Sequence, residues 1–151
     1  MEKIHDRNSL HRSYSFFKEA QEKPLIKQSH IQPPNWDKLV SLFGVEWGKT
    51  VVTYGDTCYC KDKLSLDLEV HESIHCIQQT NPEKWWERYY IDPAFRLNQE
   101  LEAYKEQYRF MRKAIKDRNV LFIFRAKIAG DLSGKMYGNI IKFDEAYKLI
   151  G

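Results

Sequence analysis

The chain has few cysteines: its 151 residues contain three, Cys58, Cys60 and Cys76. An odd number of thiols in a chain without a recognisable leader argues against a disulfide framework and favours reduced cysteines. Residues 1–30 contain no apolar run long enough for a signal peptide, and no later window approaches the length of a membrane span. We therefore expect a cytoplasmic protein that has no membrane partner.

An excess of charge of one sign is also missing, because 24 Lys and Arg face 21 Asp and Glu and leave a net charge of +3. This value is too small for strong steering toward nucleic acid or for a polybasic membrane anchor. Basic residues are most concentrated at 109–127, but Glu102 and Glu106 lie on the same predicted helix and no base-stacking motif accompanies them. We expect a solvated basic face rather than a nucleic-acid site.

Proline and glycine are sparse as well, with five and seven residues, so each one marks a boundary. Pro33-Pro34 disfavours helix and separates a polar N-terminal arm, residues 1–34, from residues 35–151. Apolar residues make up 42% and aromatic residues 14% of the chain, which is enough for a packed core. Its length fits one domain, which we place at 35–151.

The pattern of this domain predicts an α+β fold that is mostly helical. Apolar residues three and four apart predict helices at about 36–43, 65–80, 93–116, 120–130 and 143–149. Asn35, Gly44 and Asp92-Pro93 suit helix ends. Between residues 50 and 60, β-branched and aromatic residues flank Gly55-Asp56, which predicts a hairpin or a small antiparallel sheet before the second helix.

That second helix carries the sequence His71-Glu72-Ser73-Ile74-His75, which is an HExxH motif. Histidines four residues apart lie one above the other on a helix, so both offer an imidazole nitrogen to a single ion at about 2.0–2.1 Å. Glu72 is rotated by about 100° from His71 and is placed to reach a metal-bound water rather than the metal. The motif therefore predicts a zinc site with Glu72 as general base.

A third protein ligand is needed, and the sequence limits where it comes from. Metzincins have a third histidine in HExxHxxGxxH, but this chain has Gln78 in place of the glycine and Asn81 in place of the histidine. That class is excluded. A later helix offers two carboxylates, Glu100 and Glu102, within Gln99-Glu100-Leu101-Glu102-Ala103-Tyr104.

Together the two motifs resemble those of glutamate zincins, in which the third ligand lies on such a helix and a small alanine lets the helices approach. On that family's spacing Glu100 is the ligand and Glu102 is solvated. Tyr104 stands where the family commonly has an aspartate that orients a ligand histidine. Either the Tyr104 hydroxyl or another residue must take this role.

A further resemblance, over about residues 47–150, is to small metallopeptidases encoded by bacteriophages. It rests on HExxH, on Gln99–Tyr104 and on three further segments: Trp85-Trp86-x-Arg88-Tyr89-Tyr90-Ile91-Asp92-Pro93, Leu132-Ser133-Gly134 with Tyr137-Gly138-Asn139, and Asp144-Glu145-Ala146. The resemblance implies a zincin-like fold, zinc, and a peptide or protein substrate. It also implies a host cytoplasm or a phage particle as location, with a partner from the particle or the host.

The leading hypothesis is therefore a zinc metallopeptidase. The alternative is an inactive phage structural or accessory protein in which zinc only staples the fold, and a fourth ligand such as Cys76 or Glu102 would favour it. The oxyanion donor is open among five residues, Tyr89, Tyr90, Arg96, Tyr104 and Tyr108. The strands at 50–60 offer an edge to which an extended peptide adds.

Overall fold

The computed structural model describes residues 26–151, so most of the predicted arm lies outside the described residues. In chain order the elements are β1 (Lys27–Ser29), α2 (Trp36–Phe43), β2 (Val52–Tyr54), β3 (Thr57–Tyr59), α3 (Leu66–Gln78), α4 (Pro82–Ile91), α5 (Pro93–Ala114), α6 (Arg118–Leu132), the 3-10 turn η1 (Lys135–Tyr137) and α7 (Phe143–Ile150). Over this range the fold is α+β and mostly helical, as predicted. No helix in it combines the length and the apolar character needed to cross a membrane.

The helix ends follow from local chemistry. Gly44 ends α2 in the left-handed region at φ 62°, where a side chain would be strained. The Asn81 side chain accepts a hydrogen bond from the Lys84 amide at the start of α4, and Asp92 does the same at the start of α5. Proline follows each of these caps at the first helical position, where no amide proton is needed.

The sheet has three strands in the order β1-β3-β2 and is mixed. The predicted hairpin is present, since β2 pairs antiparallel with β3 around the Gly55 turn. The sheet extends beyond this hairpin, because β1 pairs with β3 in parallel. β1 falls within the range assigned to the loose arm, so residues 27–29 belong to the folded domain. Their side chains are polar and show no strand pattern. The strand forms through its pairing with the distant β3.

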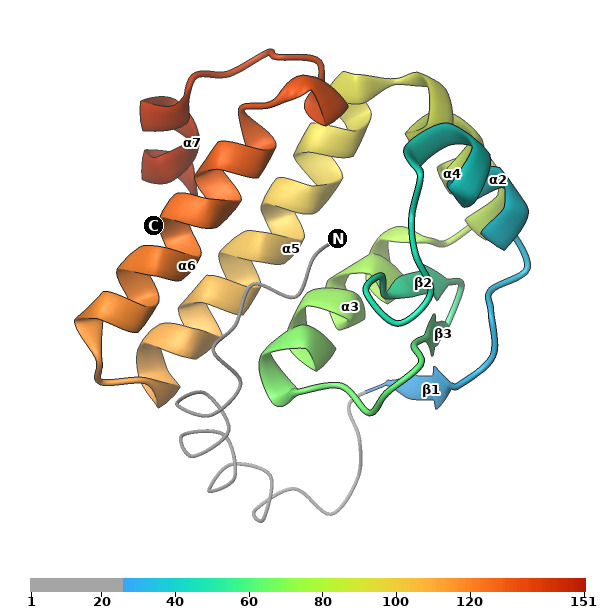
Figure 1. The fold of residues 1–151 in the computed structure, drawn as a ribbon, viewed down its shortest axis with the longest axis horizontal. Helices are drawn as coiled ribbons and strands as arrows, with labels where there is room; N and C mark the ends of the chain where they lie inside the picture. The colour runs from blue at the N-terminus through green and yellow to red at the C-terminus, as the bar shows by residue number, and fades with distance from the viewer. Residues whose placement is uncertain (1–25) are drawn as a thin grey trace.

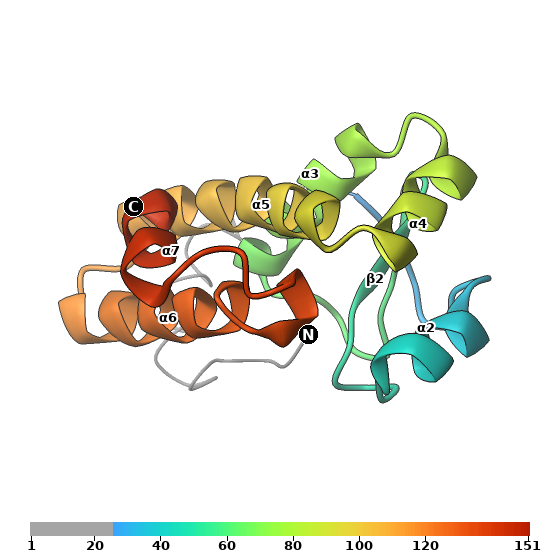
Figure 2. The same cartoon turned by 90° about the horizontal axis from the view of Figure 1, so that it is seen from above.

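The helices surround α5. Figure 1 shows α3 on one side of α5 and α6 on the other, while α7 packs on α5 and α6. Figure 2 shows the sheet, α2 and α4 at one end of the molecule and α6 with α7 at the other. The largest apolar core lies among α3, α5, α6 and α7, and a second core of aromatic rings joins α2, β2 and α4. The HExxH helix α3 runs between these two parts.

The buried face of α3 is unusually polar. Besides Leu66, its buried residues are Asp67, Glu69, His71, Glu72 and His75. Buried polar groups are costly unless they are hydrogen-bonded or bind an ion. The facing side of α5 buries Glu100, Ala103 and Gln107. This polar seam between two helices is where the candidate site lies.

Candidate metal centre

Three buried side chains converge at the seam: His71 and His75 from α3 and Glu100 from α5. Their side chains are 1%, 3% and 1% exposed. The two Nε2 atoms are 3.1 Å apart, Oε2 of Glu100 is 3.2 Å from His71 Nε2, and Oε1 is 3.3 Å from His75 Nε2. One ligand atom from each residue lies within 4.8 Å of the others, so the group can hold a metal ion. Each of the three was predicted from the sequence.

A chain of hydrogen bonds fixes the tautomer of His71. The Gln107 amide nitrogen donates to Oδ2 of buried Asp67 at 2.8 Å, which turns the amide oxygen toward the histidine. That oxygen is 2.9 Å from His71 Nδ1, so Nδ1 carries the proton and donates it. The Nε2 lone pair of His71 consequently points at the centre of the group.

His75 is oriented in the same way by a second glutamine. The Gln78 amide nitrogen donates to the backbone carbonyl of Gln99 at 3.0 Å, and its oxygen lies 2.8 Å from His75 Nδ1. Nδ1 again holds the proton and Nε2 faces inward. Gln78 is the residue whose presence excluded a metzincin, and here it orients His75, one of the three residues that can hold a metal.

Two imidazole nitrogens and one carboxylate therefore face one another among buried side chains. Oε2 of Glu100 is buried and accepts no hydrogen bond, although it lies 3.2 Å from His71 Nε2. The absence of a hydrogen bond between these two atoms is expected when His71 Nε2 has no proton to donate. Such an arrangement is repulsive unless a cation or a proton occupies its centre. The orphaned oxygen and the two converging nitrogens together fit a metal ion.

In the metal-free protein a proton takes the place of the cation. Burial by itself lowers the pKa of His75, but the neighbouring Glu100 carboxylate outweighs it and raises the pKa to about 9. Burial raises the pKa of Glu100, while the two histidines hold it well below its usual range. The proton therefore resides on His75, and an arriving ion must displace it.

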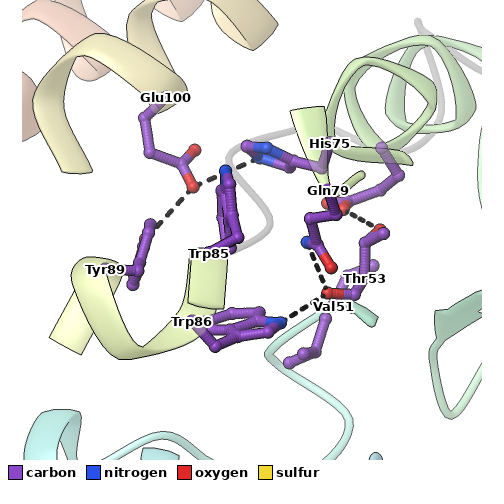
Figure 3. Close-up of a pocket in the computed structure, with 10 residues that line it drawn as sticks. Val51, Thr53, His75, Gln79, Trp85, Trp86, Tyr89 and Glu100 are labelled. Atoms are coloured by element: carbon purple, nitrogen blue, oxygen red, sulfur yellow. Dashed lines mark hydrogen bonds and ion pairs between the residues drawn. The ribbon is translucent and has the colours of Figure 1, made fainter. Parts of the chain in front are cut away.

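Glu72 lies beside this group and contributes no atom to it. Its side chain is buried, and Oε2 accepts a 2.7 Å hydrogen bond from the Thr53 hydroxyl on β2. Glu72, His75 and Glu100 border the same cavity of about 20 Å³, whose other walls include Trp85 and Trp86 (Figure 3). A cavity of this size has room for one water molecule, and the carboxylates of Glu72 and Glu100 give that water polar partners. Its place between the candidate base and two candidate ligands suits a reacting water.

Among the oxyanion candidates, Tyr89 has a hydroxyl that contacts the triad. Its hydroxyl donates to Oε1 of Glu100 at 3.1 Å (Figure 3), and burial raises its pKa far above the usual value, so it stays protonated. Arg96 instead donates to backbone carbonyls, among them that of Met136 at 2.8 Å. The ring of Tyr108 stacks on Phe124.

The remaining aromatic rings support the ligands sterically. The Tyr104 ring meets the His71 ring edge-on at 4.4 Å, and the Trp85 ring meets His75 in the same way at 5.7 Å. Neither histidine depends on Tyr104 for its orientation, because Gln107 and Gln78 hold both Nδ1 atoms. Of the two alternatives left open by the sequence, another residue provides the orientation.

The second acidic residue of the later helix is not part of the group. Glu102 is exposed, while Glu100 is buried. Ala103 is completely buried on the same helix face as Glu100 and Gln107, where a larger side chain would hold the helices apart. Within residues 26–151 the group that can hold a metal has three members, and Cys76 is not among them.

Sequence reasoning missed Asp67, Gln78, Gln107 and Thr53 as parts of the site. Asp67 stands four residues before His71 on α3, and Gln78 stands three after His75. Both spacings place the residue beside its histidine on a helix. The Gln107 contact crosses from another helix, so no local spacing reveals it.

We expect Gln107→Leu to lower metal affinity about 10–100-fold, the usual cost of losing the group that orients a ligand histidine. The leucine retains volume but removes the acceptor of the His71 Nδ1 proton. Zinc affinity measured by competition with a chromophoric chelator tests this expectation. Gln32→Ala, a change at an exposed glutamine, is the control. Unchanged affinity in a folded Gln107→Leu protein would contradict the role of Gln107.

No protein-family model matches the chain, and comparison with curated proteins and with solved structures found none that is similar. The functional reading of these residues therefore depends on their own geometry and chemistry.

Proposed function

We propose that the chain is a zinc-dependent metallopeptidase in which His71, His75 and Glu100 hold the metal and Glu72 is the general base. The observation that carries this proposal is the convergence of two fixed imidazole lone pairs and an orphaned carboxylate oxygen. The HExxH spacing and the cavity beside Glu72 add to it.

Zinc is preferred among the metals that suit two imidazoles and one carboxylate. Ligand atoms about 2.0–2.1 Å from a tetrahedral zinc ion stand about 3.3 Å apart. The two Nε2 atoms are 3.1 Å apart, and each lies near a different oxygen of Glu100, His71 at 3.2 Å from Oε2 and His75 at 3.3 Å from Oε1. The same ligand types also bind non-haem iron, but HExxH on one helix is typical of zinc hydrolases. When bound, zinc supplies a Lewis acid that lowers the pKa of a coordinated water toward about 7.

Glu72 would move the proton in this reaction. The Thr53 hydroxyl donates to Oε2 and so fixes the orientation of the Glu72 carboxylate. A carboxylate bordering the cavity can take a proton from water during attack on a peptide carbonyl and pass it to the leaving amine. Tyr89 holds the Glu100 carboxylate and thereby positions a ligand.

A structural zinc site is the second candidate, and the burial of the three ligands favours it. Structural sites normally have four protein ligands, whereas three leave a position for water or substrate. The group within residues 26–151 has three. This count supports the enzyme over the staple. The resemblance to phage metallopeptidases suggests a peptide or protein substrate in a host cell or a phage particle.

The test is metal content together with cleavage. The full chain, dialysed against a chelator and then titrated with zinc, should take up one ion per chain and then hydrolyse a fluorogenic library of unstructured peptides. Zinc uptake without cleavage of any member would favour the structural staple. A folded protein that takes up no zinc would contradict both candidates.

A further inference from the structure

The outer edge of β2 faces the candidate site, and it is already occupied. Within the described residues β2 has a strand partner only on its β3 side. Val52 and Tyr54 pair with β3, and between them the Thr53 carbonyl points outward. This carbonyl accepts hydrogen bonds from the side chains of Gln79 and Trp86, at 2.9 and 3.2 Å. An incoming strand would need the same acceptor.

The Gln79 side chain imitates a peptide group of such a strand. Its amide nitrogen donates to the Thr53 carbonyl, and its oxygen accepts a 2.8 Å bond from the Gly55 amide. Thr53 lies on the strand and Gly55 in the turn that follows it, so a strand added to this edge would take the Thr53 carbonyl and reach the turn amide beside it. One side chain, 4% exposed, thus occupies the acceptor of the edge and the donor of the adjoining turn. Figure 3 shows Gln79 and Trp86 meeting at Thr53.

The Gln79 side chain, which we call the cap of the β2 edge, is connected to the candidate site in two ways. Gln79 ends the HExxH helix, and its backbone amide donates to the carbonyl of His75 at 3.1 Å. Thr53, whose carbonyl is capped, uses its hydroxyl to hold Glu72. A peptide paired with the edge at Thr53 would therefore lie next to the base and the metal group. The described arrangement, with a cavity that admits only a water molecule, is closed to such a peptide.

We propose that Gln79 is a built-in competitor of the substrate: its side-chain amide holds the β2 edge until an extended peptide replaces it with its own backbone. The inference rests on the proposed peptidase function, because it names how that site selects its substrate. It makes Gln79 a specificity-determining residue. A polypeptide with a continuous backbone can replace both hydrogen bonds of the Gln79 side chain. A small molecule with one amide group cannot displace Trp86 as well.

Binding of an unfolded polypeptide to the full, zinc-loaded chain tests the proposal. The parent protein is Glu72→Gln, which prevents cleavage, and the probe is fluorescein-labelled β-casein followed by anisotropy. Adding Gln79→Ala should tighten binding about tenfold, because two hydrogen bonds no longer compete with the probe. Trp86→Phe, which removes one donor and keeps a ring, should tighten it less. Gln32→Ala should leave it unchanged.

Hydrogen exchange at the Gly55 amide checks that the edge has opened, since exchange should become faster in Gln79→Ala. Unchanged or weaker casein binding with faster Gly55 exchange would overturn the inference, as would absence of casein binding in every variant. If Gln79→Ala unfolds, the casein affinity of Trp86→Phe decides: tighter binding supports the inference, and unchanged or weaker binding overturns it. Gln79→Ala could bind casein more tightly while the protein that retains Glu72 fails to cleave it. That result would support the role of Gln79 at the β2 edge and refute the proposed peptidase function.

Discussion

Glu100→Gln is expected to lower zinc affinity by a hundredfold or more, while Glu102→Gln leaves it unchanged. Structural zinc sites bind with about 10–16 kcal/mol from four ligands, so each ligand contributes roughly 3 kcal/mol, or more than a hundredfold. Glu100 supplies the only charged oxygen of the triad and Glu102 is exposed. Glutamine preserves the shape at both positions, so the pair is matched.

Two measurements check this result. Metal content after dialysis gives the stoichiometry, and the midpoint of thermal unfolding should rise with zinc in the wild-type protein and in Glu102→Gln but scarcely in Glu100→Gln. His71→Ala should behave like Glu100→Gln, because it removes one of the two imidazole ligands. Equal loss of zinc from the Glu100 and Glu102 variants would mean that the metal binds elsewhere.

Glu72→Gln is expected to lower the rate of peptide hydrolysis about 10²–10⁴-fold and to leave zinc bound. The amide oxygen of glutamine can still accept the hydrogen bond from Thr53, so the packing around residue 72 is retained. Glutamine cannot take a proton, and this difference separates the role of a base from that of a ligand. The loss should appear in kcat more than in KM, since the substrate contacts remain.

The matched comparison for Glu72→Gln is Thr53→Val, which keeps volume and removes the hydroxyl that orients the carboxylate. It should show a partial loss of rate. A fully active Glu72→Gln protein would refute the proposed mechanism. Loss of zinc from the same variant would place Glu72 among the ligands, in disagreement with its position beside the group.

Five of the six α-helices in residues 26–151 were predicted, helped by local signals at helix ends, whereas α4 (Pro82–Ile91) was not. Asp92-Pro93 and Gly44 act within one turn of chain, and the structure uses them as expected. Strand β1 was not predictable, because Lys27–Ser29 are polar and pair with residues 57–59, about thirty positions away. The pattern of neighbouring residues indicates only local conformational preference, whereas β1 forms because it pairs with β3.

The same division holds for the site. His71 and His75 were predictable since a helix alone brings them together, and Glu100 followed from the resemblance to a known ligand spacing. Gln107 was not, because its role depends on the crossing of α3 and α5. The covered edge at Thr53 also had no signal, since the sequence suggests an available strand and says nothing of Gln79 folding back over it.

Two of the hydrogen bonds cross from α3 to α5 without using any metal-facing atom. Gln107 on α5 reaches Asp67 at 2.8 Å, and Gln78 on α3 reaches the Gln99 carbonyl at 3.0 Å. The two helices are thus joined before an ion arrives, and the ligand rotamers are already set. In small zinc domains the free energy of ligation folds the chain. Here the three side chains are already oriented by hydrogen bonds, so little side-chain freedom would be lost if an ion bound, and the proposed site is preorganised.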